Sequence, residues 1–523
     1  MKCSRLLAAL VLVAASPLLS GQPVGPEFRL NAHTTGDQRL PAVAASMAFN
    51  SGGFVVAWQS DGQDGDGKGI FTRLFDSAGS SLSSFRVNDY TTGDQKLPSV
   101  GVDLFGNFVV AWASYGQLAP GGDILARRFD SSGTSLGGEF VVNTSLPGDQ
   151  FNAGVAVGFI YFMVVWYDDA ASQVVARRFS STTGAPVGGS FPVDPTLLAA
   201  STNPDIFAKT NGFLVTWTDL PASDRDIFAH RFDFGANPVG SRFQVNTFTA
   251  GDQTHARVAS SRDEMTFAVV WASPGEDGDG AGVFGRLYDY SGVPKTAEFQ
   301  VNAYTTGDQQ APVVAFDTDS SLVVVWESVG QDGSGSGIYR RRFDTSGVPL
   351  SGVSRVNSYT TGAQSAPVVS AVGNGDYVVS WESAGQDGDG FGVYGQRHCT
   401  PLQSVTLTAY NNTPICTNGT GALAVVSDVG GGYGSHQWGY KTTPGGTFNP
   451  ISGETFVTYQ IQGSDFPPSP GTYYLVCRTT PECGSVTDSN VVGVTIISAA
   501  NDTTTPTVNA PFPGPILTQT LCQ

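Results

Sequence analysis

The chain has 523 residues and a net charge of −18. Hydrophobic residues make up 40% of it and charged residues 14%, which is enough apolar material for a folded core and excludes global disorder. Phosphate binding needs clustered lysine and arginine, so the acidic balance excludes nucleic acid as a partner.

The first residues have the pattern of a secretory signal peptide. Lys2 and Arg5 supply positive charge, an apolar run covers residues 6–15, and small residues follow at Ser20 and Gly21. The run is too short to cross a bilayer, and no other segment is long enough. The sequence therefore predicts a signal peptide over 1–20, a secreted or cell-surface location, and no membrane span.

An apolar string of the form Phe-Val-Val-x-Trp recurs along the rest of the chain. Its tryptophans are spaced 54, 54, 51, 54, 55 and 55 residues apart and are Trp58, Trp112, Trp166, Trp217, Trp271, Trp326 and Trp381. A near-constant period of this size, with several β-rich runs in each period, is typical of a repeat architecture.

Each repeat contains four β-rich runs separated by Gly, Asp, Ser and Asn turns. In the first repeat they cover residues 41–48, 54–58, 69–76 and 85–88. The last run is a Phe-Arg-Val-Asn string, and a polar Thr-Gly-Asp-Gln loop follows it. Four short antiparallel strands per repeat describe one blade of a β-propeller.

The two ends of the repeat region are incomplete in complementary ways. The seventh repeat stops after its third strand, at residues 393–397, whereas the chain begins with an unpaired fourth strand at residues 28–31. Adding that strand to the last blade would close a ring and remove an exposed edge. We therefore predict an all-β fold with a seven-bladed β-propeller over 27–398, closed by an N-terminal strand. A linear solenoid is the alternative, but it would not explain the complementary ends.

Residues 399–498 lose the repeat. Frequent turns and the order Cys416, Trp438, Cys477 predict an immunoglobulin-like β-sandwich of about 100 residues. In an exported protein disulfides are expected. Cys416–Cys477 is the preferred bridge and Cys416–Cys483 the alternative, with Cys399 and Cys522 the other cysteines of the mature chain. Residues 499–523 are rich in Thr and Pro and are expected to form a flexible tail.

The joined repeat FRVN-x-x-TTGDQ, FVV-x-W, GQDGDG-x-GI, RRFD resembles a β-propeller repeat of large secreted or surface bacterial proteins. The C-terminal domain resembles the bacterial immunoglobulin-like modules that follow such repeats. These resemblances imply a β-architecture and an adhesive or scaffolding setting. They supply no set of catalytic residues.

Two polar motifs of each repeat are expected on one face of the propeller, because the hairpin after the tryptophan strand and the crossover between blades emerge together. The Gly-Gln-Asp-Gly-Asp-Gly motif survives in blades 5, 6, 7 and 1. Closely spaced Asp oxygens on a glycine loop predict Ca²⁺ ligands. Plain turns, whose Asp side chains bond their own amides, are the alternative. The candidate calcium ligands are Asp64, Asp66, Asp277, Asp279, Asp332, Asp387 and Asp389.

Other recurring side chains are expected to be structural. The crossover Asp of Thr-Gly-Asp-Gln should bond loop amides, and the tryptophans should form the core between blades rather than a ligand platform. The arginines of the third strand are expected to pair with neighbouring acidic loops, and they are Arg73, Arg127, Arg177, Arg286 and Arg341.

Catalysis has little support in the sequence. The five histidines form no metal-spaced pair, and most carboxylates repeat with the blade; Glu327 and Glu382 are the least poor acid/base candidates. We therefore expect no enzyme. We expect a secreted, monomeric binding, adhesion or scaffold protein whose loop face holds an extracellular glycan, protein or surface ligand, with calcium assisting. A glycan-active propeller enzyme and a spacer that displays the immunoglobulin-like module are the alternatives.

Overall fold

The computed structural model describes most of the chain from residue 22 to residue 497. The described ranges are 22–46, 52–118, 120–195, 202–220, 223–317, 321–373 and 376–399, followed by shorter segments between 404 and 497. The predicted signal peptide (1–20) and tail (499–523) lie outside them. Within these ranges no helix is long and apolar enough to cross a membrane. The chain divides into two units, and the second contains the chain from Cys399 onward together with residues 373–376.

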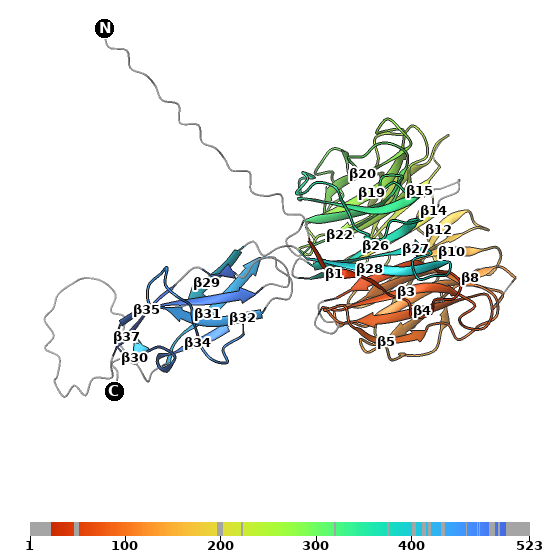
Figure 1. Cartoon of the computed structure of the whole chain (residues 1–523). Coiled ribbons are helices and arrows are strands. Elements are labelled where there is room, and N and C mark those ends of the chain that lie inside the picture. Colours follow the sequence, from red (N-terminus) through yellow and green to blue (C-terminus); the bar gives the residue numbers. More distant parts are fainter. Residues whose placement is uncertain are drawn as a thin grey trace, which may run out of the picture. The chain divides into compact units, whose positions relative to one another are not determined.

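The described part of the first unit consists of four-stranded antiparallel sheets that follow one another in sequence (Figure 1). Sheet 1 contains β2 (Gln38–Ala45), β3 (Phe54–Asp61), β4 (Lys68–Phe75) and β5 (Ser81–Arg86). Sheet 2 contains β6 (Gln95–Val102), β7 (Phe108–Tyr115), β8 (Gly122–Phe129) and β9 (Phe140–Val141). Sheet 3 contains β10 (Gln150–Val157), β11 (Tyr161–Asp168), β12 (Gln173–Ser180) and β13 (Phe191–Pro192).

The same order continues through the later repeats. Sheet 4 contains β14 (Thr202–Lys209), β15 (Gly212–Asp219), β16 (Asp226–Asp233) and β17 (Pro238–Gln244). Sheet 5 contains β18 (Thr254–Ser260), β19 (Thr266–Pro274), β20 (Ala281–Asp289) and β21 (Phe299–Gln300). Sheet 6 contains β22 (Gln309–Phe316), β23 (Leu322–Val329), β24 (Ser336–Phe343) and β25 (Ser354–Arg355).

Sheet 7 joins the two ends of the repeat region. It contains β26 (Gln364–Gly373), β27 (Asp376–Ala384), β28 (Phe391–Cys399) and, on its outer edge beside β28, the N-terminal β1 (Gln22–Arg29) (Figure 1). Just after β1, the amide of Leu30 donates to the carbonyl of Val393 at 2.8 Å. The predicted N-terminal strand therefore completes the last sheet and covers what would have been an unpaired edge.

The core lies between neighbouring sheets. The second strand of each sheet is buried almost throughout, and its tryptophan is at most 1% exposed. Trp112, for example, packs in one cluster with Val55 and Leu74 of the preceding sheet. Strands covered on both faces read as continuous apolar runs, which is why the Phe-Val-Val-x-Trp string recurs. The prediction that the tryptophans form inter-sheet core is confirmed.

Each innermost strand has the same local irregularity. In sheets 1, 2, 3 and 6 its first two residues pair with the neighbouring strand before a bulge, as in Gln38↔Ser60 and Arg39↔Gln59, and in sheets 4 and 5 its first residue does. This pairing places the start of β2 three residues before the predicted one. The residue at the bulge has a left-handed backbone with φ between 47° and 57° in all seven sheets: Leu40, Leu97, Asn152, Asn203, His255, Ala311 and Ala366.

The second unit is a pair of sheets. One contains β29 (Ser404–Ala409), β31 (Thr420–Val429) and β34 (Thr458–Gln462). The other contains β30 (Ile415–Cys416), β37 (Val492–Ile497), β35 (Gly471–Thr480), β32 (Ser435–Lys441), β33 (Asn449–Pro450) and β36 (Thr487–Asp488). A 3-10 turn covers Gly463–Asp465. The core of the second unit contains Trp438, Leu475 and Cys477. The Tyr473 hydroxyl donates to the carbonyl of Ser469 at 2.9 Å.

The preferred disulfide, Cys416–Cys477, is wrong. Cys477 carries a buried thiol, whereas Cys399 is disulfide-bonded. The sheet order β30-β37-β35 explains this, because it places Cys416 two strands away from Cys477. Strands are about 4.8 Å apart, so two steps exceed the roughly 7 Å that a disulfide spans between Cα atoms. The side chains of Cys416, Cys483 and Cys522 lie outside the described residues, and the alternative Cys416–Cys483 bridge stays a prediction.

Candidate functional site

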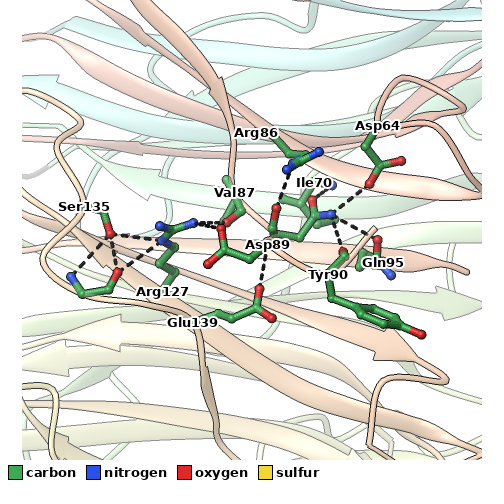
Figure 2. A network of polar contacts seen from close by, with 12 residues as sticks. Asp64, Ile70, Arg86, Val87, Asp89, Tyr90, Gln95, Arg127, Ser135 and Glu139 are labelled. Atoms are coloured by element: carbon green, nitrogen blue, oxygen red, sulfur yellow. Dashed lines mark hydrogen bonds and ion pairs between the residues drawn. The ribbon is translucent and has the colours of Figure 1, made fainter. Parts of the chain in front are cut away.

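In sheets 1, 5 and 7, the first Asp of the acidic loop bonds an asparagine at the end of the fourth strand. Asn88 Nδ2 donates to Asp64 Oδ2 at 2.9 Å, and the same atom also donates to Gln95 Oε1 of the next crossover at 3.2 Å. Asn88 Oδ1 accepts from the amide of Ile70 at 2.8 Å. Figure 2 shows that Asp64, Ile70 and Gln95 surround this asparagine at the junction between two sheets. One buried asparagine therefore connects a hairpin, a strand and a crossover.

Two sheets without the acidic loop also have a carboxylate bonded to the junction asparagine, but there it comes from an Asp on the third strand. In sheet 2, Asn143 Nδ2 donates to Asp123 Oδ1 at 2.8 Å, and in sheet 4, Asn246 Nδ2 donates to Asp226 Oδ1 at 2.6 Å. These aspartates stand where sheet 1 has Gly69. A Cβ atom at Gly69 would lie 2.5 Å from Asp64 Oδ2, so the loop Asp and a side chain at this strand position exclude each other.

The second Asp of the loop bonds the next sheet. Asp66 Oδ2 accepts from the amide of Gly93 at 3.0 Å, and Asp389 Oδ2 accepts from the amide of Gly36 at 3.0 Å. Asp279 makes the equivalent bond with Gly307 at 3.2 Å. Crossover aspartates in turn accept from backbone amides of the preceding sheet's hairpin, and they are Asp37, Asp149, Asp252 and Asp308. The prediction that they bond loop amides is confirmed.

These contacts bear on the seven candidate calcium ligands. Six of them lie in pairs on single loops, Asp64 with Asp66, Asp277 with Asp279 and Asp387 with Asp389, and Asp332 is the single Asp of its loop. Within the described ranges, no group of three or more His, Cys, Asp or Glu is placed to hold a metal ion. One buried carboxylate oxygen on each of Asp64, Asp332 and Asp387 has no hydrogen-bond partner and could face a cation. Calcium binding stays a prediction.

The recurring arginines behave differently from the expectation that they pair with acidic loops. Arg73 Nη1 donates to the carbonyl of Leu30 at 2.9 Å. Arg177, Arg286 and Arg341 make the same bond, at 2.9–3.1 Å, to a carbonyl of the preceding sheet's fourth strand. A guanidinium reaches this carbonyl because the fourth strand ends beside the next sheet. Arg127 alone among the five also pairs with a carboxylate, Asp89, at 2.8 Å (Figure 2).

Glu327 and Glu382, the acid/base candidates, support the bulges of the innermost strands. Glu382 accepts from Arg39 at 2.6 Å and from the amide of Leu40 at 3.1 Å. Glu327 accepts from Gln310 at 3.3 Å, and burial raises its pKa. Gln59, which like the two glutamates directly follows the tryptophan of the second strand, accepts from the amide of Leu97 in the same way. The residue after the tryptophan therefore holds the left-handed residue of the next sheet. We find no catalytic arrangement at Glu327 and Glu382.

A cavity of about 480 Å³ lies where the innermost strands of all seven sheets meet. Four sheets line it with Leu, Ala, Pro and Val at the bulge and the two following positions, except for Ser99 of sheet 2. Sheets 3, 4 and 5 break this pattern. We call their polar residues the polar arc, and they are Asn152, Asn203, Asp205, His255 and Arg257.

The side chains of the polar arc leave several groups open to a ligand. Asn152 Nδ2 donates to Asn203 Oδ1 at 3.2 Å, and the amide hydrogens of Asn203 have no acceptor among the described residues. His255 Nδ1 contacts Thr254 Oγ1 at 3.1 Å, and its Nε2 has no partner in the part of the chain that the structure describes. Arg257 Nη1 donates to the adjacent carbonyl of Ala256 at 3.0 Å. Asp205 is held by the amide of Val258 at 2.9 Å.

The surroundings shift two titrating groups of the arc. Burial lowers the pKa of His255, and the positive charge of Arg257 lowers it further. Burial raises the pKa of Asp205, although Arg257 and the amide of Val258 oppose this effect. His255 is therefore neutral at neutral pH, although its ring is open to solvent inside the cavity. A neutral imidazole can accept a proton, and a carboxyl group with a raised pKa can donate one.

Sequence reasoning missed the polar arc. The repeat itself contained the information, because the arc occupies two fixed positions, two and four residues after the crossover Gln in most sheets. Five of the seven bulge residues precede proline, whereas Asn152 and His255 do not. Comparison of the seven repeats at these positions would have identified the polar substitutions.

No protein-family model and no curated protein matches the chain. Solved structures that resemble it include the Dos1 propeller, which is 12% identical with a TM-score of 0.42 over 72% of this chain and 95% of that one. A GH43 endo-arabinanase from Bacillus licheniformis is 14% identical, with a TM-score of 0.30 over 48% of this chain and 93% of its own. A PL25 ulvan lyase is 9% identical, with a TM-score of 0.45 over 72% and 94%. The successive four-stranded sheets of the described residues are those of a β-propeller.

The prediction that the chain is not an enzyme is wrong as an inference from the repeat. Solved structures that are similar to the chain include two glycan-cleaving enzymes, a GH43 endo-arabinanase and a PL25 ulvan lyase. The reasoning failed because it considered the residues that repeat. The innermost strands carry residues that do not.

Proposed function

We propose that the protein is a glycan-active β-propeller that binds a saccharide in its central cavity. The observation that carries the proposal is the polar arc, where five polar side chains from three adjacent sheets replace the apolar residues of the other four. A cavity of about 480 Å³ is large enough for a few sugar units. The adhesion function predicted from the sequence would not require this asymmetry.

The arc supplies both kinds of group that a glycosidic bond needs for cleavage. His255 is a neutral acceptor that can take a proton from an attacking water, while Asp205 can donate a proton to the leaving oxygen. As the water oxygen bonds to the anomeric carbon, the bond from that carbon to the leaving oxygen breaks. Asn203 and Arg257 can donate hydrogen bonds that orient the sugar hydroxyls.

Glycan hydrolysis can be tested with His255→Asn. Asparagine is suited to this site because Asn152 and Asn203 hold the same left-handed conformation in the two preceding sheets. The wild-type protein should bind oligosaccharides on a glycan array and release reducing ends from at least one of them. The variant should bind with similar affinity and lose at least about a hundredfold in rate, as expected for removal of a general base.

The matched control is Leu97→Ala on the apolar side of the cavity. Alanine occupies the equivalent position in two other sheets, so the substitution preserves the backbone, and activity should change by less than about threefold. Equal losses in both variants, or no glycan bound by the wild-type protein at any concentration up to millimolar, would contradict the proposed function.

We also propose the finer architecture and location. Seven four-stranded sheets with β1 closing the last support a seven-bladed ring, and the paired sheets with the Tyr473 hydroxyl bonded upstream support an immunoglobulin-like sandwich. The disulfide at Cys399 supports export to an oxidising compartment. Mass spectrometry of the secreted chain, with and without reduction, tests the signal cleavage and the disulfide together.

A further inference from the structure

The innermost strands carry a net positive charge, whereas the whole protein is negatively charged. The chain has 45 acidic and 27 basic residues. On the seven innermost strands, however, the basic residues are Arg39, Lys96, Lys209 and Arg257, and Asp205 is the single acid among their described residues. A cavity surrounded by protein concentrates such a field, because its walls have a low dielectric constant.

Arg257 is the cation of this group that lines the cavity and is available to a ligand. Arg39 is paired with Glu382 at 2.6 Å, and Lys96 with Asp94 at 3.2 Å. Lys209 is 6% exposed and lies against the rings of Tyr290 and Phe267. Arg257 contacts one neighbouring carbonyl and forms no ion pair with any described residue, which leaves most of its N–H groups unused.

Asn203, beside Arg257, also supplies hydrogen-bond donors. Its amide hydrogens have no acceptor among the described residues, and the Nε2 atom of His255 has no partner among them. The acceptor nearby, Asp205, already receives the amide of Val258. A neutral sugar presents hydroxyls that both donate and accept, whereas this set favours a group with several acceptor oxygens and negative charge.

We infer that the saccharide bound in the central cavity carries an anionic group, a carboxylate or a sulfate ester, which pairs with the Arg257 guanidinium. This inference rests on the proposed function and names its substrate class. The planar guanidinium presents two parallel N–H groups that match both oxygens of a carboxylate or two oxygens of a sulfate. Asn203 and His255 then contact the same sugar unit from the adjacent sheets.

The test compares three oligosaccharides that differ at one functional group. Calorimetry with the full chain measures the affinity for a uronic-acid tetrasaccharide, for the same tetrasaccharide with its carboxylates reduced to alcohols, and for a sulfated neutral tetrasaccharide. The uronate or the sulfated compound should bind at least about tenfold more tightly than the reduced one, as expected for a charge-assisted pair in a sheltered site. The tighter of the two identifies the anionic group.

Arg257→Gln assigns the preference to this side chain. The variant should bind the anionic tetrasaccharide at least about tenfold more weakly and should lose much less affinity for the reduced compound, so that the preference for the anion disappears. Arg257→Lys should recover part of the preference, because it retains the charge without the planar pair of donors. Circular dichroism and the melting temperature establish that both variants fold.

The outcomes separate this inference from the proposed function. Equal affinity for the charged and reduced compounds, with His255→Asn still abolishing turnover, would overturn the anionic substrate and leave the glycan activity intact. An anion preference that survives in Arg257→Gln would overturn the role of Arg257. If none of the three compounds nor any array glycan binds, both proposals fail.

Discussion

The junctions between the sheets and the walls of the central cavity use the same polar residue types in opposite ways. At the junctions, Asn88, Asp64 and Gln95 bond one another and the backbone, and equivalent sets recur around the propeller. In the cavity, His255 and Arg257 occur once and keep atoms that have no partner among the described residues. Polar groups that repeat and are satisfied stabilise the fold, while polar groups that break the repeat are free to bind a ligand.

The largest difference between the two regions should appear in stability. Asn31→Ala removes the junction asparagine that closes the ring, which is 1% exposed and bonds Val393, Gln38 and Asp387. Leaving several buried partners unsatisfied should lower the free energy of unfolding by about 3 kcal/mol. Denaturant unfolding followed by tryptophan fluorescence measures the loss.

The matched substitution in the cavity is Asn152→Ala. It replaces an asparagine that makes one side-chain bond in a position where two other sheets have alanine, so the loss should stay below about 1 kcal/mol. Equal losses for Asn31→Ala and Asn152→Ala would show that the cavity asparagines are structural too. That result would remove the distinction on which the site assignment depends.

An exchange between sheets sharpens the structural half of the comparison. Gly69→Asp alone should lower the free energy of unfolding by about 2 kcal/mol, because its Cβ would lie 2.5 Å from Asp64 Oδ2 and two carboxylates would meet. The double variant Asp64→Gly with Gly69→Asp reproduces the arrangement of sheet 2 and should recover most of that loss. Independent, additive effects in this double-mutant cycle would contradict the exchange.

Much of the fold was readable from the repeat, and the site was not. The tryptophan period, the four runs per repeat and the complementary ends predicted the sheets and the position of β1. The loss of the acidic loop together with a carboxylate at Asp123 or Asp226 was also visible. Whether Arg257 has an ion-pair partner depends on side-chain positions across sheets, which no spacing encodes. The carboxylates that recur in the repeat were the obvious site candidates, but in the structure they bond the junctions between the sheets.

Lys209 should make the free energy of unfolding depend on pH, with a smaller effect than the substitutions at the junctions. Burial lowers its pKa from 10.5 to about 8, so between these values the folded protein binds fewer protons than the unfolded chain. The free energy of unfolding should therefore rise as the pH increases from about 8 to 10.5, by about 1 kcal/mol after solvent screening. Lys209→Met should be more stable at pH 7 and should lack this rise. Identical pH profiles for the two proteins would show that the lysine is solvated.

Calcium should have the smallest effect. The acidic loops offer one unpartnered carboxylate oxygen each at Asp64, Asp332 and Asp387, while their other oxygens are bonded within the protein. Sites with few free ligands bind calcium at about millimolar concentration, so about 1 mM Ca²⁺ should add roughly 0.4 kcal/mol per occupied loop. Melting curves in EDTA, Ca²⁺ and Mg²⁺ measure this, and Asp64→Asn should reduce the calcium increment. A melting temperature that is the same in all three solutions would leave the loops as junction elements alone, and would strengthen the division between satisfied and available polar groups.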